Sequence, residues 1–185
     1  SLPLPIDRCF TAIDPEARTV QVAGGGEIAF DIASIDTGGV GRGAAVLGAD
    51  PRLIDVRPIG AFVERLADCP ALGRVVVAGG GAGGVELAFG LRNRAGADPQ
   101  PGVVLVTGAD GLLPRFAGAV QRRAARVLAR QGIAVVEGPI ALERGTVVAG
   151  GASLEPVDTI ITALGSAAPP WVRASGIAID ADGFI

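Results

Sequence analysis

The residues whose types and spacing best indicate chemistry are three glycines in the run VVVAGGGAGGVELA at Val75–Ala88. Gly79, Gly81 and Gly84 fill the pattern G-x-G-x-x-G, and Glu86 follows two residues later. At a strand-to-helix turn, such glycines permit a tight turn, let the backbone approach a pyrophosphate and let the helix pack closely. The N–H groups at the helix N-terminus then face the anion. The run therefore predicts a dinucleotide-binding turn.

The elements on either side of this turn strengthen the prediction. We expect a buried strand at Arg74–Ala78 and a helix at Val85–Arg94, which is the context that the otherwise weak motif requires. The intervening residues Gly80, Ala82 and Gly83 are therefore candidate cofactor-binding residues as well. A glycine-rich loop without a ligand remains the alternative, because the chain contains 29 glycines.

Composition excludes several other kinds of site. The chain has no His, Tyr or Met, and its two cysteines, Cys9 and Cys69, lie 60 positions apart. Ser-His-Asp and Cys-His catalysis, His-containing metal sites and a C-x-x-C redox pair are therefore excluded. We expect no catalytic side chain and no metal site, and we expect both cysteines to be inert core residues. A bound cofactor must carry any redox chemistry.

Length, charge and hydropathy narrow the class of protein. A chain of 185 residues can form one large or two small domains. It has 16 basic and 19 acidic residues, and it lacks the basic stripe with interleaved aromatic residues that indicates nucleic-acid binding. The apolar runs are shorter than the ~20 residues of a membrane-spanning helix, and no signal peptide is recognisable. We expect a cytoplasmic protein without a transmembrane segment.

The start of the chain predicts an antiparallel β-meander. We expect strands at Arg8–Ile13, Arg18–Ala23 and Glu27–Ile35, with a tight glycine turn before the third strand. Residues 40–58 are rich in Gly, Arg, Asp and Pro, and this composition predicts a connector between two domains.

The rest of the chain predicts an α/β fold in which strands and helices alternate. The expected elements are a helix at Ile59–Leu66, strands at Arg74–Ala78, Val103–Thr107, Ile133–Glu137 and Thr159–Leu164, helices at Val85–Arg94 and Phe116–Gln131, and a hairpin through Ala141–Val148 and Ala152–Glu155. This order predicts a parallel sheet whose nucleotide edge lies at the carboxyl ends of the strands.

Two of the expected helices carry an apolar stripe at helical spacing. The stripes consist of Ile59, Phe62, Val63 and Leu66 in one helix, and of Phe116, Val120, Ala124, Val127 and Leu128 in the other. Four arginines, at 122, 123, 126 and 130, lie largely away from the second stripe. They form either a phosphate site or a solvated helix face, and the solvated face is the simpler interpretation.

Four segments, taken in order, resemble the motifs of one family. They are AFDIASIDTGG at Ala29–Gly39, RVVVAGGGAGGVELA, LLPRF followed by RQGIAVVEG, and VDTIITALGSAAPPWVRASGIAIDADGFI. Together they are similar to the pyridine nucleotide-disulfide oxidoreductases, which are flavoproteins with two dinucleotide-binding units. Within that superfamily the chain most resembles the type II NADH dehydrogenase-like branch, which includes the flavoprotein module fused to selenide, water dikinase.

The resemblance implies how the chain is divided. Residues 51–167 correspond to a Rossmann-like NAD(P)-binding domain. Residues 1–50 resemble the later part of an FAD-binding domain, and residues 168–185 resemble the return of the chain to it. The family's N-terminal unit, which holds the ADP half of FAD, has no counterpart before Ser1. We therefore expect a piece of a longer protein whose FAD domain is incomplete, and an oligomer is left open.

The resemblance also implies roles for the candidate residues. The turn at Gly79–Gly84 holds NAD(H) or NADP(H), while Glu86 either lies near the nicotinamide or only complements the helix dipole. Thr37 and Gly38, and likewise Leu164 and Gly165, either approach FAD or mark the crossing between domains, or they simply end strands. Trp171 is expected to anchor the chain against the absent domain.

The end of the second expected strand departs from the usual pattern for NAD. Such sites place Asp or Glu there to bind the ribose, but this chain has Thr107 followed by Gly108. Asp110 could substitute for the missing carboxylate, and Arg115 could bind a 2′-phosphate. No basic residue immediately follows Thr107, which favours NAD(H), while NADP(H) stays open.

The resemblance implies a flavin-dependent oxidoreductase. Its parent protein would pass a hydride from NAD(P)H to FAD and then to an unidentified acceptor, and this piece alone is expected to be inactive. The alternative is a non-catalytic nucleotide-binding or scaffolding module fused to another enzyme.

Overall fold

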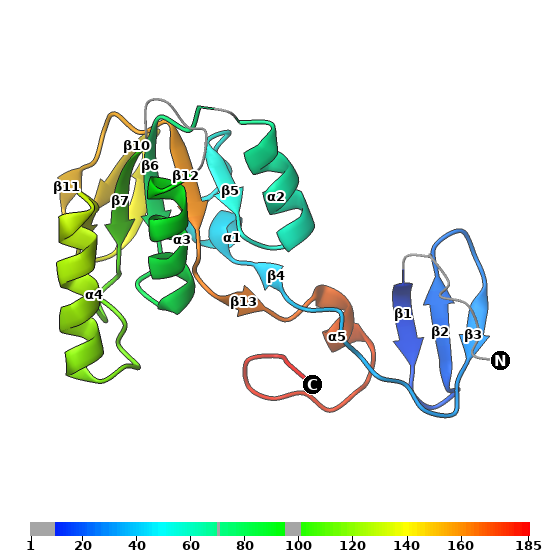
Figure 1. Ribbon diagram of the computed structural model, residues 1–185. Coiled ribbons are helices and arrows are strands. Elements are labelled where there is room, and N and C mark those ends of the chain that lie inside the picture. The colour runs from blue at the N-terminus through cyan, green and yellow to red at the C-terminus, as the bar shows by residue number, and fades with distance from the viewer. Residues whose placement is uncertain (1–9, 70, 95–100) are drawn as a thin grey trace. The chain divides into compact units, whose positions relative to one another are not determined.

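The computed structural model describes residues 10–69, 71–94 and 101–185, and the chain forms two compact units. The larger unit comprises Gly41–Ser166, and the smaller combines Ser1–Val40 with Ala167–Ile185 (Figure 1). The assignment of residues 1–50, 51–167 and 168–185 to an FAD domain and an NAD(P) domain stays a prediction.

The larger unit is built on a five-stranded parallel sheet, which confirms the expected α/β fold. Its strands lie in the order β5 (Leu53–Asp55), β12 (Thr159–Thr162), β6 (Arg74–Ala78), β7 (Gly102–Val106) and β8 (Ala134–Val136). Helix α3 (Ala82–Arg92) connects β6 to β7, and α4 (Gly118–Arg130) connects β7 to β8. The strands after β6 thus extend to one side of it, whereas β12 and β5 lie on the other.

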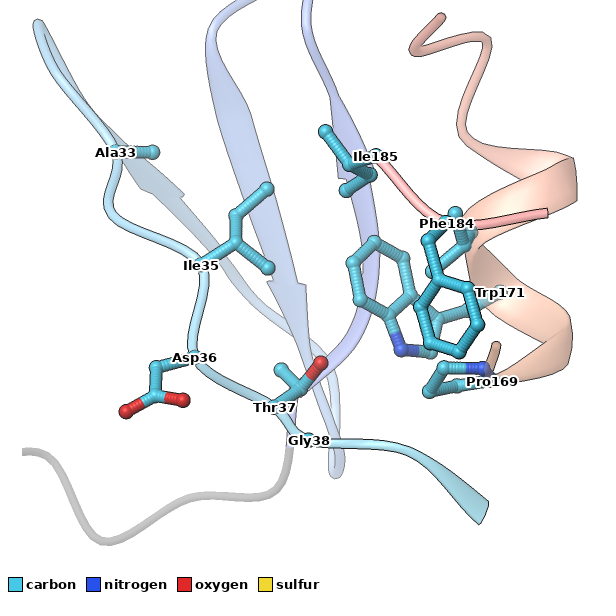
Figure 2. Close-up of a pocket in the computed structure, with 10 residues that line it drawn as sticks. Ala33, Ile35, Asp36, Thr37, Gly38, Pro169, Trp171, Phe184 and Ile185 are labelled. Carbon is cyan, nitrogen blue, oxygen red and sulfur yellow. The ribbon is translucent and has the colours of Figure 1, made fainter. Parts of the chain in front are cut away.

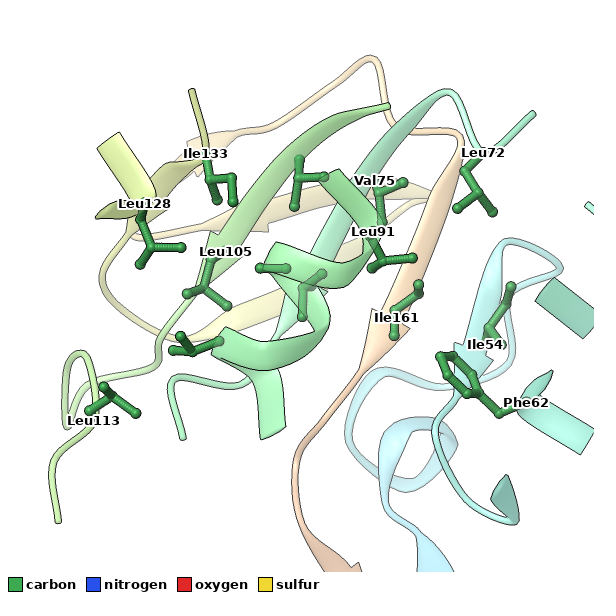
Figure 3. Close-up of a cluster of buried hydrophobic side chains, with 14 residues drawn as sticks. Ile54, Phe62, Leu72, Val75, Leu91, Leu105, Leu113, Leu128, Ile133 and Ile161 are labelled. Carbon is green, nitrogen blue, oxygen red and sulfur yellow. The ribbon is translucent and has the colours of Figure 1, made fainter. Parts of the chain in front are cut away.

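One face of this sheet packs against the helices. Val75, Leu105 and Ile161 point to the same side as Leu91 of α3 and Leu128 of α4, and all five are buried (Figure 3). The central strands are apolar at nearly every position because both faces of a parallel sheet are covered.

The opposite face packs against a three-stranded antiparallel meander and a short helix. The meander consists of β9 (Ile140–Glu143), β10 (Thr146–Ala149) and β11 (Ala152–Ser153), and the helix is α1 (Gly43–Leu47). Val76, Val104 and Ile160 of the sheet share this second core with Val147 and Leu47. The sequence predicted a two-stranded hairpin here, whereas the structure has a three-stranded meander.

The segment at residues 40–58 is not the simple connector that its composition predicted. It contains β4 (Val40–Gly41), α1 and β5, and β5 pairs in parallel with β12. The backbone N–H of Gly43 donates to Asp55 Oδ2 at 2.7 Å, which fixes the start of α1 to the end of β5. Strands of two or three residues are too short for an alternating pattern to reveal.

Two expected apolar faces are only partly buried. In α2 (Ile59–Ala67), Phe62 is buried, but Ile59 and Val63 are 59% and 57% exposed. Of the second stripe, Leu128 is buried, whereas Phe116 and Val120 are 45% and 43% exposed. The helical spacing correctly predicted both helices, but each packs on the sheet over only part of its apolar arc.

The smaller unit contains the antiparallel sheet β1 (Phe10–Asp14), β2 (Thr19–Val22) and β3 (Glu27–Ala29), together with α5 (Pro170–Ala174). The third strand ends six residues before the expected Ile35, and Ile32 is 92% exposed. Arg8 and Cys9 lie outside the described residues. A two-stranded sheet joins β13 (Ser166–Ala167) to β4.

Candidate functional site

The glycine turn lies at the carboxyl edge of the sheet, where the strand order reverses. It follows β6, which has β7 on one side and β12 on the other. The N–H of Gly79 donates to the carbonyl of Val106 at 2.8 Å, and the N–H of Ala163 donates to that of Ala78 at 2.8 Å. Open α/β sheets bind ligands at such a switch point.

Three glycines of the turn are required by the packing of the protein itself. Gly79 has φ +136°, and a Cβ there would collide with the carbonyl oxygen of Ala163. A Cβ at Gly84 would collide with the carbonyl oxygen of Gly79, so α3 can lie this close to the turn only with glycine there. A Cβ at Gly80 would lie 2.7 Å from Thr107 Cβ. Protein contacts alone therefore explain these glycines.

Gly81 and Gly83 are different, because packing does not require them. Both are exposed, and a Cβ at either position would meet no described atom within 4 Å. Gly81 has φ −76° and ψ −179°, an extended conformation that any residue adopts. Because Gly81 and Gly83 have no side chain, the outer surface of the turn is open and a ligand can approach the backbone.

The N-terminus of α3 adds an uncompensated positive end to this open surface. Gly81 is its N-cap, and among the described residues no side-chain hydrogen bond caps the helix. The first turn carries no acidic residue. The backbone N–H groups of Ala82, Gly83 and Gly84 lack intrahelical acceptors, as in every helix, and their dipoles favour an anion.

Glu86 lies beside an apolar groove of about 490 Å³ between α2 and α3. The groove is lined by Val56, Leu66, Gly83, Glu86, Leu87, Gly90, Leu91 and Arg94. Glu86 is exposed and supplies the only carboxylate among the described residues of this lining. Gly83 belongs both to the turn and to the groove, so the two features are continuous.

Thr107 ends up beside the glycine turn and is only 7% exposed. Its hydroxyl donates to the carbonyl of Gly108 at 3.4 Å. The N–H of Leu113 donates to the carbonyl of Gly80 at 2.7 Å, so the loop after β7 is fixed against the turn. Asp110 and Arg122 line a separate hollow of about 640 Å³ beyond β7.

Sequence reasoning missed the residues that support the turn from outside the motif. The carbonyl oxygen of Gly111 lies 2.5 Å from the position of a Cβ on Gly80, and Ala163 lies against Gly79. Together with Leu113 they hold the turn in place, but no spacing pattern connects them to it.

Thr37 and Gly38 belong to the smaller unit, where they line a hollow of about 410 Å³ with Trp171, Phe184 and Ile185. Figure 2 shows Thr37 facing the rings of Trp171 and Phe184, while the Asp36 carboxylate points away from them. The Trp171 ring also meets Phe10 edge-on, with ring centroids 4.7 Å apart and an interplanar angle of 84°. The indole is therefore half-buried within its own unit.

Gly165 lies in the larger unit, after β12. It is exposed with φ +81°, and a Cβ on it would meet no described atom within 4 Å. The structure thus gathers Gly79–Gly84, Glu86, Thr107 and Gly108 in one unit and places Thr37 and Gly38 in the other.

The strongest electrostatic interactions lie at the opposite, amino end of the sheet. Arg52 donates to Asp50 Oδ2 at 2.9 Å and to Glu155 Oε1 at 3.1 Å. The Arg52 guanidinium holds the pKa of Asp50 below its ordinary value. The Val147 N–H, followed by Arg52, lowers the pKa of Glu155. This cluster is a structural clamp, since it lies at the wrong edge for a nucleotide.

Two further properties concern the described part of the chain. No helix in it is long and apolar enough to cross a membrane. No group of three or more Asp, Glu, Cys or His side chains in it is arranged to hold a metal ion.

The parallel sheet, its crossover helices and the glycine turn define a class: a Rossmann-like α/β protein. The sequence matches the pyridine nucleotide-disulphide oxidoreductase family over residues 6–185. The chain therefore belongs to this family, which confirms the family that its four sequence segments resemble.

Solved structures share this fold. The ferredoxin reductase for the CYP199A2 system from Rhodopseudomonas palustris has a TM-score of 0.75 and 23% identity, over 95% of this chain and 45% of that chain. Putidaredoxin reductase, in its covalent complex with putidaredoxin, has a TM-score of 0.71 and 23% identity, and the match covers 92% of this chain and 43% of that chain. The water-forming NADH oxidase from Lactobacillus brevis bound to NADH has a TM-score of 0.68 and 17% identity, and the match covers 95% of this chain and 41% of that chain.

These likenesses concern the fold. The present chain spans less than half the length of each of these three proteins. A comparison with curated proteins finds none that matches it.

Proposed function

We propose that this chain is the NAD(P)H-binding part of an FAD-dependent oxidoreductase. The observation that carries the proposal is the open surface at Gly81 and Gly83, two glycines that protein packing does not require. A dinucleotide pyrophosphate needs this close approach to backbone N–H groups. The unneutralised N-terminus of α3 supplies the complementary charge.

The remaining candidate residues position the two ends of the cofactor. The apolar groove that continues from Gly83 suits a nicotinamide ring, with the Glu86 carboxylate at its side. Thr107 and Gly108 lie where the adenosine ribose would bind. Because no basic residue immediately follows Thr107 to bind a 2′-phosphate, we propose NADH as the preferred cofactor.

FAD is proposed for the parent protein. Thr37 and Gly38 line a hollow of the smaller unit, and their backbone is exposed for contact with a flavin nucleotide. Gly165 is similarly open in the larger unit. When bound, FAD would accept the hydride from the nicotinamide cofactor and pass electrons on. The protein's own residues hold and orient the cofactors.

We place the parent in the type II NADH dehydrogenase-like branch, which includes the module fused to selenide, water dikinase. The four sequence segments support this placement. The free thiol of Cys69 fits a reducing, cytoplasmic compartment. The acceptor is proposed only as an oxidant that takes electrons from FAD.

Calorimetric titration of the 185-residue chain with NADH and with NADPH tests the proposal. We expect submillimolar binding, tighter for NADH, and a loss of affinity of at least about ten-fold in Gly81→Val, because the new side chain would occupy the pyrophosphate surface. The matched control is Gly60→Val, since Gly60 is also exposed and has no described atom within 4 Å of a Cβ. Absence of binding for both dinucleotides would contradict the proposal for this chain.

A second experiment on the parent protein distinguishes an enzyme from a scaffold. Anaerobic addition of NADH should bleach the flavin absorbance of a hydride-transferring enzyme. Dinucleotide binding without bleaching would instead support the non-catalytic nucleotide-binding module.

A further inference from the structure

Helix α4 carries four of the chain's 16 basic residues and no acidic residue. Residues 111–136 contain five arginines and no Asp or Glu, although the whole chain has a net charge of −3. Four of these arginines, at 122, 123, 126 and 130, lie on α4 and are exposed. An ordinary solvated helix face carries charges of both signs. On this helix the charges are all positive.

Three of them form a continuous surface with a neighbour on α3. Arg123, Arg126 and Arg130 line one hollow of about 140 Å³. Arg130 and Arg92 line a second hollow of about 380 Å³ with Asn93 and Gln131. We name Arg92, Arg123, Arg126 and Arg130 the arginine surface. The two helices that carry it lie on the same face of the sheet (Figure 1).

The arginine surface has no acidic partner within the described chain. Two ion pairs between described residues join Arg52 to Asp50 and to Glu155, and neither includes a residue of the arginine surface. Arg126 instead donates to the carbonyl of Arg122 at 3.3 Å, and Arg92 donates to that of Gln131 at 2.9 Å. Like charges at i, i+4, such as Arg126 and Arg130, destabilise a helix. An external anion would relieve this repulsion.

We propose that the arginine surface docks a protein partner through an acidic segment. Arginine forks bind carboxylates with two parallel hydrogen bonds, and the hollows between the side chains leave room for such groups. Val127 lines one hollow, and Val120 is exposed on the same helix, so apolar contacts flank the charges. Mixed arginine and apolar contacts are typical of protein interfaces.

Other polyanions fit this surface less well. None of the described residues that line the two hollows is aromatic, so the bases of a nucleic acid would find no ring there on which to stack. Leu128, on the apolar side of α4, is buried against the sheet and is therefore not available to enter a membrane.

The test uses the whole chain and a fluorescent decaglutamate peptide. Binding is measured by anisotropy at low and at physiological ionic strength, because contacts between exposed charges weaken as salt rises. We expect the double variant Arg123→Glu with Arg130→Glu to lose at least about ten-fold in affinity. The matched control reverses Arg57 and Arg144, which are exposed outside the arginine surface, and should lose less than about two-fold.

Circular dichroism checks that both double variants fold. If the charge-reversed variant does not fold, the neutral variant Arg123→Gln with Arg130→Gln replaces it. The proposal is overturned by undetectable peptide binding, by equal losses in variant and control, or by tighter binding of oligouridylate or of phosphatidylserine vesicles than of the peptide. Its outcome is independent of NADH binding, since Gly81 is not part of the arginine surface.

Discussion

At the residue scale, the glycines of the turn differ in what excludes a side chain. Gly84 faces the carbonyl oxygen of Gly79, a backbone atom that cannot rotate away. We therefore expect Gly84→Ala to lower the free energy of unfolding by about 2–4 kcal/mol, through separation of α3 from the turn. Urea denaturation followed by circular dichroism measures the change.

Gly90 gives the matched comparison on the same helix. It is exposed, and a Cβ on it would meet no described atom within 4 Å. Gly90→Ala should therefore raise the free energy of unfolding by about 0.5–1 kcal/mol, because alanine loses less backbone entropy in a helix. If both substitutions had the same effect, the close approach at Gly84 would not be what requires glycine there.

At the element scale, Arg52 joins the start of β5 to the segment between β11 and β12. It bonds Asp50, Glu155 and the carbonyl of Gly145, the last at 2.7 Å. Arg52→Met should lower the free energy of unfolding by about 1–2 kcal/mol at neutral pH, since the pairs are only partly screened by solvent. Thermal unfolding at several pH values measures the loss.

The same clamp predicts a pH dependence with a definite sign. The folded-state pKa values of Asp50 and Glu155 are lowered, so their stabilisation is present above about pH 4 and is lost as the pH falls through the folded-state values. The stability difference between the wild type and Arg52→Met should therefore shrink on acidification. Arg65→Met is the control, because Arg65 bonds the carbonyl of Pro51 rather than a carboxylate. A difference that stays constant from pH 7 to about pH 3 would contradict the linkage.

The sequence predicted the long elements well and the short ones poorly. Strands β6 and β7 and helices α3 and α4 follow from strong apolar patterns of known period. Strand β5 could not be predicted in this way, because three residues are too few to show an alternating apolar pattern. It pairs in parallel with the edge of β12. The glycine motif similarly located the turn but not Ala163 or Gly111, since contacts across the sheet edge leave no local pattern.

Helix α2 shows how far a helical pattern predicts packing. Phe62 is buried, whereas its neighbour Val63 is 57% exposed, although both lie on the expected apolar face. We predict that Phe62→Ala lowers the free energy of unfolding by about 3–5 kcal/mol and that Val63→Ala changes it by less than about 0.5 kcal/mol. Chemical denaturation compares the two. A large loss for Val63→Ala would mean that this side chain is covered in solution.

At the scale of the whole molecule, the two units differ in how deeply the strands of their sheets are buried. The larger unit has a core on each face of its sheet, and residues such as Val76 and Leu105 are completely buried. The described part of the smaller unit contains the antiparallel sheet of β1–β3, whose strands are about half exposed. The parent's proposed flavin site draws on this smaller unit, so its stability bears on whether the chain alone can bind FAD.

Hydrogen exchange of the whole chain tests this difference directly. Amides of β6, β7 and β12 should exchange only through global unfolding, because these strands are paired on both sides and buried on both faces. Amides of β1–β3 should exchange at least about ten-fold faster, through local opening of a small sheet. Equal protection in the two sheets would contradict this expectation. In that case the smaller unit would be held by contacts as strong as those of the larger core, and a flavin site in it would need no further domain for its stability.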